Sequence, residues 1–242
     1  MNLSETAEKA ITAYGGRELW QNATTLDAVV SVYGWAFRLK WRPFFRHASI
    51  SMDVHRPYSR LSPIGRNPAI TGVLDGGDVR RENESGMIVS ERRNARDYFT
   101  VGRRLLFWDD LDMSYFANYA FWNYFTLPVL LMREDISWTE LEPGVLEARF
   151  PKEIPTHSRL QRFRFDRKTG QLLQHDYTAD IISPLAKASN VVLAHRKNDS
   201  GLVYPSERSV TPRSPKGAPL SHPLLIHIDV HDFRLMNGSR RS

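Results

Sequence analysis

The sequence predicts a mainly β fold of the α+β class, in which a strongly curved antiparallel sheet, a half-barrel, wraps around one central helix. Short apolar segments separated by turn residues recur along most of the chain, as consecutive antiparallel strands require. The segment 111–131 differs, because its apolar and aromatic residues would cover every side of a helix, and such a helix must be surrounded by protein. No linker-like stretch divides the 242 residues, so a single domain over 1–242 is expected.

Two short helices are expected at the N-terminal end, over residues 3–22. Ser4 is a suitable N-cap for the first helix, and Tyr14-Gly15-Gly16 is suited to end it. From Thr24 the spacing of apolar residues changes to every second position, which indicates a strand.

The sheet is expected over 24–91 and again over 141–235. Asp75-Gly76-Gly77-Asp78 indicates a tight hairpin turn, and Lys168-Thr169-Gly170 indicates another. A loop rich in proline, serine and glycine is expected at 212–223. The expected strands are 24–33, 47–55, 59–64, 70–74, 79–82, 87–91, 141–150, 159–166, 171–182, 203–212 and 224–235.

The central helix is expected to begin after Asp109 or Asp110, since a carboxylate at that position caps the helix and interacts favourably with its positive end. Pro128 should bend or end it. The stretch 113–132 has no formal charge over about the length that a bilayer needs. Its serine, asparagines, tyrosines and proline favour a helix inside the protein, and no membrane span is expected.

Composition excludes several kinds of site. The chain has no cysteine, which rules out disulfides, thiolate zinc sites, iron–sulfur clusters and a cysteine nucleophile. The formal net charge is +6, but basic residues are scattered among acidic ones, as in Arg80-Arg81-Glu82, so no nucleic-acid partner is expected. Residues 1–9 have no basic start followed by an apolar run, and together with the absence of cysteine this predicts a cytoplasmic location.

Three features of the chain resemble one known family. Ala-Tyr-Gly-Gly-Arg-Glu-Leu-Trp at 13–20 leads directly into a strand, Gly-Val-Leu-Asp-Gly-Gly-Asp-Val at 72–79 forms a hairpin sequence, and a helix follows in mid-chain. This arrangement is similar to lipoprotein carriers of the LolA/LolB type, incomplete β-barrels with a helical plug. The resemblance implies a concave sheet that accepts an apolar ligand. We expect no export signal here, and the chain has no cysteine to be lipidated, which counts against lipoprotein transport as the function.

Three further segments resemble a group of uncharacterised bacterial and fungal proteins. They are 108–112, 155–158 with Gln161, and 174–179. This likeness spans most of the chain and brings no known activity with it.

Two histidines are candidate catalytic residues. In the strand 171–182, His175 and Tyr177 alternate onto the same face as Leu173, Ala179 and Ile181, so both should point inward. A half-buried imidazole with a near-neutral pKa can act as a general acid or base, whereas the alternative is a core histidine bonded to a tyrosine or a backbone carbonyl.

His157 lies just before the strand 159–166, where functional side chains often gather beside a cavity, or it caps a turn through Ser158. His157 and His175 could act as a pair if their strands are neighbours. Asp109 could orient one of them from the cavity mouth if it does not serve only as an N-cap.

The central helix offers candidate ligand-binding residues. Tyr115, Tyr119 and Asn123 recur at every fourth position, and their polar groups could hydrogen-bond a ligand in an otherwise apolar pocket. A plain aromatic core is the alternative. The candidate ligand-binding residues are Trp108, Tyr115, Tyr119, Trp122, Asn123 and Gln161.

The last expected strand holds His227, Asp229 and His231 on one face. Residues two apart on a strand can chelate one metal ion, but the apolar residues between them claim the core side and leave these three to solvent. No metal is expected, and whether these residues bind one stays open. No cofactor is expected either, because nucleophile-elbow, Walker and dinucleotide motifs are all missing from the sequence.

These observations favour a protein that binds an apolar small molecule, fatty, terpenoid or polyketide-like, in the cavity of the curved sheet. The alternative is a cofactor-independent enzyme of the isomerase, cyclase or hydratase type that uses the histidines with Asp109 or Tyr177. A structural protein without a ligand is the third possibility. A monomer or a homodimer is expected, and the fold alone does not decide among these functions.

Overall fold

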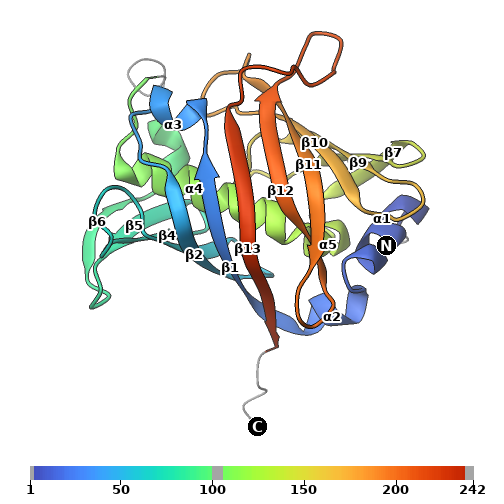
Figure 1. Cartoon of the computed structure of the whole chain (residues 1–242), viewed down its shortest axis with the longest axis horizontal. Helices are drawn as coiled ribbons and strands as arrows, with labels where there is room; N and C mark the ends of the chain where they lie inside the picture. The colour runs from blue at the N-terminus through green and yellow to red at the C-terminus, as the bar shows by residue number, and fades with distance from the viewer. Residues whose placement is uncertain (1–2, 100–105, 238–242) are drawn as a thin grey trace.

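The computed structural model describes residues 3–99 and 106–237. Figure 1 shows one broad sheet that curves around a long helix. The strands are β1 (Ala23–Tyr33), β2 (Phe45–Asp53), β3 (Tyr58–Ser62), β4 (Thr71–Asp75), β5 (Asp78–Glu82), β6 (Ile88–Arg92), β7 (Ser137–Glu142), β8 (Val145–Arg149), β9 (Leu160–Phe165), β10 (Leu172–Thr178), β11 (Lys187–Lys197), β12 (Val203–Pro212) and β13 (Ile226–Asn237).

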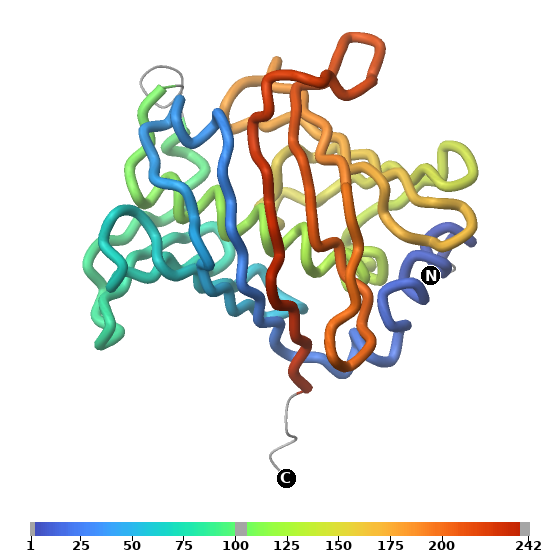
Figure 2. The backbone as a smooth tube through the Cα atoms, in the orientation of Figure 1, coloured from blue at the N-terminus to red at the C-terminus, as the bar shows by residue number. Residues whose placement is uncertain are grey.

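The first and last strands of the chain pair with each other in the middle of the sheet. The strand order is β6-β5-β4-β3-β2-β1-β13-β12-β11-β10-β9-β8-β7, and every pairing is antiparallel. The first and last strands therefore lie side by side, as Figure 2 shows in blue and red. Within the described ranges β6 and β7 are left as edges, so the sheet is curved but unclosed, and the predicted half-barrel is confirmed.

Apolar alternation determines which face of the sheet is buried. In β1, Leu26, Ala28, Val30 and Val32 are buried and the residues between them are more exposed, as the sequence predicts. Register shifts interrupt the pairing of β1 with both β2 and β13. An extra residue at such a bulge bends a strand and increases its twist, which contributes to the curvature of the sheet.

The central helix is buried on all sides but is divided in two. Helix α4 (Asp110–Phe125) is followed by α5 (Leu127–Met132), and Thr126 between them donates its hydroxyl to the Trp122 carbonyl at 2.6 Å. Pro128 occupies the first turn of α5, where its missing N–H costs nothing. The predicted break near Pro128 is confirmed. None of the helices in the described part of the chain combines the length and the apolar character needed to cross a bilayer.

The predicted N-terminal helices are present as α1 (Glu5–Ala13) and α2 (Arg17–Asn22), which pack near α5. The Ser4 side chain accepts a hydrogen bond from the Ala7 amide, so this N-cap is confirmed. Two short helices were not predicted: α3 (Trp35–Leu39) and the 3-10 turn η1 (Ala95–Tyr98).

Three strand predictions are corrected. The expected strand 141–150 is a hairpin, because Gly144 adopts φ +87° and turns the chain between β7 and β8. Strand β11 was missed because buried Ser189 and Asn190 interrupt its apolar pattern. The expected strand 171–182 ends at Thr178.

Leu173 does not share a face with His175. It is 47% exposed because the register of β10 against β9 shifts between Leu172 and Gln174.

Candidate functional site

An apolar cavity of about 340 Å³ lies between the concave face of the sheet and α4. Such a volume is within the range of small-molecule pockets. One wall of the cavity is formed by strands β1, β2 and β10 to β13, and the other wall is formed by α4. The outer end is formed by α3 and the segment 179–188. The helix presents an apolar surface to this space through Met113, Phe116, Ala117, Ala120 and Phe121.

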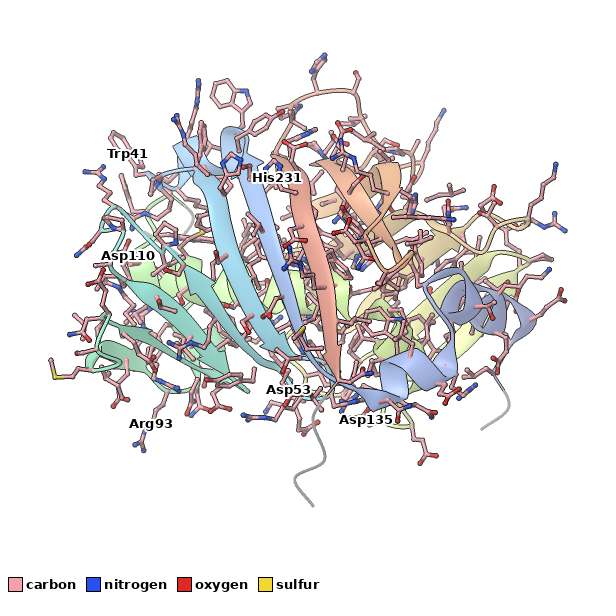
Figure 3. The ribbon with its side chains drawn as sticks, turned by 60° about the horizontal axis from the view of Figure 1, so that its bottom comes forward. Trp41, Asp53, Arg93, Asp110, Asp135 and His231 are labelled. Atoms are coloured by element: carbon pink, nitrogen blue, oxygen red, sulfur yellow. The ribbon has the colours of Figure 1, made fainter. Side chains whose placement is uncertain are left out.

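One end of the cavity opens at the surface, and its rim is apolar. Leu39, Leu106 and Leu185 line the cavity and are 50%, 56% and 85% exposed. Trp41, which points outward in Figure 3, lies against the Phe107 ring with 6.0 Å between ring centroids. Exposed apolar side chains gathered at one opening mark a place where an apolar molecule can enter.

The other end of the cavity is closed by hydroxyl groups. Tyr124 and Tyr177 both line it, and their hydroxyl oxygens are 2.9 Å apart. The Tyr124 hydroxyl also hydrogen-bonds His157 Nε2 at 2.8 Å, while the Tyr119 hydroxyl lies 3.3 Å from His157 Nδ1. His157 thus connects three tyrosines, and its ring stacks on Tyr177 with 3.9 Å between centroids.

His175 lies behind this group. Its Nε2 is 2.6 Å from Gln161 Oε1, and the Gln161 amide donates to Thr156 Oγ1 and to the Ser158 carbonyl. The centroids of the His157 and His175 rings lie 6.5 Å apart. The His175 ring also contacts the rings of Tyr124 and Tyr177. The predicted inward orientation of His175 and Tyr177 is confirmed by their burial.

All these groups are neutral over the ordinary range of pH. Burial lowers the pKa of His157 to about 3 and holds the pKa of His175 well below its usual value. Burial likewise raises the pKa of Tyr119 and of Tyr177 far above 10. Of the two alternatives for these histidines, the structure favours buried core residues over half-buried imidazoles, because both rings are fully enclosed.

Asp109 is positioned by the start of α4. Its carboxylate caps the helix by accepting a hydrogen bond from the Asp112 amide. The Asp112 carboxylate accepts one from the Asp109 amide, and the two bonds form a capping box. Arg92 forms ion pairs with both carboxylates, at 2.7 Å and 2.6 Å. The predicted N-cap is confirmed. Asp109 thus contacts Arg92 and Asp112, and its catalytic role stays a prediction.

The candidate ligand-binding residues divide into two groups. Trp108 lines the cavity, where Lys40 lies over its ring at 4.8 Å. The remaining candidates are buried, but the described lining of the cavity does not include them: they are Tyr115, Tyr119, Trp122, Asn123 and Gln161.

Hydrogen bonds inside the protein occupy Trp122 and Asn123, as they do Tyr119 and Gln161. Trp122 donates to the Asp53 carbonyl at 2.9 Å, and Asn123 donates to the carbonyls of Tyr119 and Pro155. The sequence could not indicate which side of an all-round apolar helix faces the cavity, so Phe116 and Tyr124 were missed.

The outer face carries the residues considered for a metal. Glu207, His227 and Asp229 place one ligand atom each within 4.8 Å of one another. His231, visible on this face in Figure 3, hydrogen-bonds Ser31 instead and is not part of that group. The predicted outward orientation of His231 agrees with its exposure, and metal binding here stays untested.

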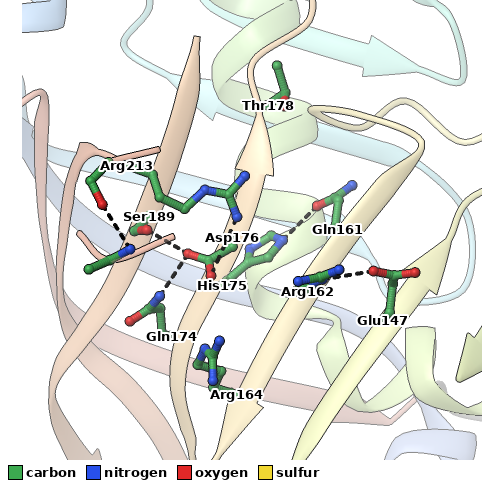
Figure 4. A network of polar contacts seen from close by, with 12 residues as sticks. Glu147, Gln161, Arg162, Arg164, Gln174, His175, Asp176, Thr178, Ser189 and Arg213 are labelled. Carbon is green, nitrogen blue, oxygen red and sulfur yellow. Dashed lines mark hydrogen bonds and ion pairs between the residues drawn. The ribbon is translucent and has the colours of Figure 1, made fainter. Parts of the chain in front are cut away.

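The convex face of β10 to β12 holds a second polar network (Figure 4). Asp176 is buried there and accepts hydrogen bonds from Ser189 Oγ at 2.6 Å and from Gln174 Nε2 at 2.8 Å. Arg213 adds an ion pair at 3.6 Å. The predicted placement of Gln174 and Asp176 on the face opposite His175 is consistent with these contacts.

Comparisons with known proteins agree on the architecture. No protein-family model and no curated protein matches the sequence. Among solved structures, a LolA superfamily protein from Nitrosomonas europaea matches with a TM-score of 0.54 and 8% identity, over 99% of this chain and 96% of that one. A putative outer membrane lipoprotein-sorting protein domain from Vibrio parahaemolyticus matches with a TM-score of 0.51 and 11% identity, over 98% and 93%.

This finding corrects one prediction and confirms another. The expected cytoplasmic location is contradicted by the match to the Vibrio structure, which is described as a putative outer membrane lipoprotein-sorting protein domain. The fold predicted from the resemblance is confirmed by two structures that match almost the whole chain. The chain has a LolA-like fold.

Proposed function

We propose that this protein binds one apolar small molecule, with a fatty, terpenoid or polyketide-like chain, in the cavity between α4 and the sheet. The observation that carries the proposal is the cavity itself, about 340 Å³ of space whose walls are nearly all aliphatic or aromatic. An apolar molecule gains about 25 cal/mol for each Å² removed from water in such a site. The apolar rim at Leu39, Leu106 and Leu185 supports entry from that end.

The similar structures support the same function from outside the chain. One of them is described as a putative outer membrane lipoprotein-sorting protein domain, and lipoproteins carry apolar chains. The ligand proposed for the present chain follows from its own lining residues, and lipoprotein transport is not part of the proposal.

A cofactor-independent enzyme is the second candidate, and one observation favours it. Tyr177, Tyr124, His157 and Tyr119 form a continuous hydrogen-bonded chain whose first two members reach the cavity. Such a chain could relay a proton to or from a bound substrate. Binding is the better-supported function, because burial lowers the pKa of His157 to about 3, and an imidazole with so low a pKa is a weak base that carries no proton to donate at ordinary pH.

The test uses the neutral fluorescent probe N-phenyl-1-naphthylamine, which emits strongly in apolar surroundings. We expect saturable fluorescence with the unmodified protein and at least about tenfold weaker binding in Ala120→Trp, whose indole would fill the cavity from α4. Thr12→Trp places the same indole on the exposed side of α1 and should bind like the unmodified protein. Thermal melts by circular dichroism establish that both variants are folded.

Two results would contradict the proposal. One is the absence of probe binding to any folded form of the protein. The other is binding that Ala120→Trp leaves unchanged, which would locate the probe outside this cavity. Loss of binding in His157→Gln with an intact fold would not separate binding from catalysis, so turnover of candidate substrates must be followed separately.

A further inference from the structure

Arg208 is a buried charge on the concave face of β12. The residue is 1% exposed, and its guanidinium lies over the Tyr124 ring, 5.2 Å from the centroid. Nη2 reaches the Tyr124 carbonyl at the long distance of 3.5 Å. Nε and Nη1 have no hydrogen-bond partner among the described residues. A buried guanidinium with this little compensation is costly to the folded state.

The position of Arg208 relates it directly to the cavity. Val210 on β12 and Ala188 on β11 line the cavity, and side chains two positions along a strand share the same face. Arg208 and Asn190 therefore form a polar layer that follows the apolar lining on the same face. In the sheet register Asn190 pairs with Val210 and Arg208 pairs with Val192, so the two polar side chains are diagonal neighbours on adjacent strands.

Asn190 is also incompletely bonded. Both atoms of its side-chain amide lack a hydrogen bond of good geometry within the described part of the chain. The amide lies near the Tyr124 hydroxyl, and it is one of the groups that lower the pKa of Tyr124, together with Tyr177 and Arg208. Burial of the hydroxyl raises that pKa. Buried polar groups are normally satisfied, so several unsatisfied atoms in one layer suggest that another molecule supplies the partner.

The electrostatic surroundings of Arg208 favour an anion. Among the described residues, no carboxylate lies within 4.0 Å of its guanidinium. Burial lowers the pKa of Arg208, and the groups that oppose this effect are the hydroxyls of Tyr14, Tyr124 and Tyr177. The positive charge of Arg208 also contributes to the low pKa of His175 and of His195. The layer is therefore electropositive and without an internal counter-ion.

Tyr124 separates this layer from the cavity. Its ring borders the cavity on one side and, on the other, a void of about 10 Å³ that Arg208 also lines. A volume of that size accommodates one water-sized group. Tyr124 thus lines both spaces, and a ligand that reaches Arg208 from the cavity must pass this side chain.

We infer that Arg208 and Asn190 form a head-group subsite for an amphiphile whose apolar chain fills the cavity and whose anionic oxygens, carboxylate or phosphate, pair with the guanidinium. Guanidinium groups pair with both of these anions through charge-assisted, often bidentate hydrogen bonds. The inference rests on the proposed function and adds the class of ligand: an acid instead of a neutral hydrocarbon, alcohol or ester.

The test is displacement of N-phenyl-1-naphthylamine by three ligands with the same chain: palmitic acid, hexadecyl phosphate and hexadecanol. We expect at least one of the two anions to compete about tenfold more strongly than the alcohol in the unmodified protein. The better competitor of the two identifies the head group as carboxylate or phosphate. Arg208→Met should bind anion and alcohol equally, while Arg208→Lys should retain part of the preference.

Two control variants locate the effect. Lys40→Met removes the cation beside Trp108 in the cavity lining, and Arg213→Met removes a cation on the opposite face of the sheet. Both should keep the preference for the anion. Loss of the preference in Lys40→Met but not in Arg208→Met would place the head group at the opening and overturn the inference.

The outcomes also separate this inference from the proposed function. If the probe binds and all three ligands displace it equally, the cavity binds apolar molecules and the head-group subsite is wrong. If neither the probe nor any ligand binds to the folded protein, the proposed function itself fails. An anion preference that Arg208→Met leaves intact would also contradict the assignment of Arg208.

Discussion

Strands β10 to β12 bury polar side chains on both of their faces, but the hydrogen-bonding capacity of these side chains is met on one face and not on the other. On the convex face, Asp176 accepts hydrogen bonds from Gln174 and Ser189 and an ion pair from Arg213 (Figure 4). On the concave face, Arg208 keeps two nitrogen atoms without a partner in the described structure. Both residues are almost completely buried, 3% and 1% exposed.

This difference separates a structural network from a candidate recognition site. A buried charge whose hydrogen-bonding capacity is met inside the protein helps to specify the fold, and removing it leaves its buried partners without hydrogen bonds. A buried charge whose capacity is unmet lowers stability, and it is expected where a ligand completes the bonding. The same strands can thus serve stability on one face and binding on the other.

The largest expected effect comes from acidification, which should break the neutral cluster on the concave face. The unfolded chain binds a proton at each histidine below about pH 6.5, whereas burial keeps His157 neutral down to a pKa of about 3. The contribution of such a histidine to the free energy of unfolding should therefore be fully present above pH 6.5. Below pH 6.5 it should fall by up to about 1.4 kcal/mol per pH unit for each such histidine. Urea unfolding at pH 7.5, 6.5, 5.5 and 4.5 measures this slope.

His157→Gln should reduce the slope between pH 6.5 and 4.5, and the exposed His231→Gln is the matched control that should not. Protonation of carboxylates adds to the acid effect in every variant, so the comparison of slopes is the informative quantity. An identical slope in His157→Gln and the unmodified protein would show that burial does not keep this imidazole neutral.

The second effect breaks the network on the convex face. Asp176→Ala should lower the free energy of unfolding by about 2–3 kcal/mol, since Ser189, Gln174 and Arg213 would lose their shared acceptor. The exposed Asp199→Ala should change it by less than about 0.5 kcal/mol. Urea unfolding at neutral pH measures both. Binding of the naphthylamine probe should survive in Asp176→Ala, because the cavity lies on the other face, and loss of binding in the folded variant would contradict the separation of the two faces.

The sequence predicts much of the fold and part of this arrangement. Alternation along β1 indicates which residues face inward, as it does for His175 and Tyr177 on β10 but not for Leu173, and an apolar pattern without a preferred side indicates a buried α4. It does not indicate which side of α4 borders the cavity, since apolar residues all round a helix define no face. Tyr124 was missed for this reason.

Arg208 and β11 were missed for a related reason. An arginine is usually exposed, but Val210 is on the same face and identifies Arg208 as inward. Strand β11 has buried Ser189 on its convex side and buried Asn190 on its concave side, so its polar residues obscure the alternation that reveals other strands. A search for hydrophobic alternation does not identify residues that belong to buried polar layers.

A third prediction sharpens the comparison by removing the unmet charge. Arg208→Met should raise the free energy of unfolding by about 1–2 kcal/mol, because a side chain of similar length replaces a desolvated cation without a carboxylate partner. Arg213→Met, on the satisfied face, should lower it. Parallel urea unfolding of the two variants measures the difference in sign. A loss of more than about 1 kcal/mol in Arg208→Met would mean that its stacking on Tyr124 stabilises the fold, and the contrast between the faces would then disappear.

The smallest expected effect concerns the route by which a ligand reaches the concave face. Leu185 is 85% exposed at the cavity rim, so Leu185→Asp should change the free energy of unfolding by less than about 0.5 kcal/mol. An added carboxylate at this opening should nevertheless slow association of the naphthylamine probe by a factor of about three, because the probe must pass an apolar rim that has become hydrated. Stopped-flow fluorescence measures this rate, with the exposed Leu193→Asp on β11 as the control. Equal rates in the two variants would mean that the ligand enters elsewhere. A slower rate in Leu185→Asp alone would show that the probe enters the cavity past the exposed leucines of this rim.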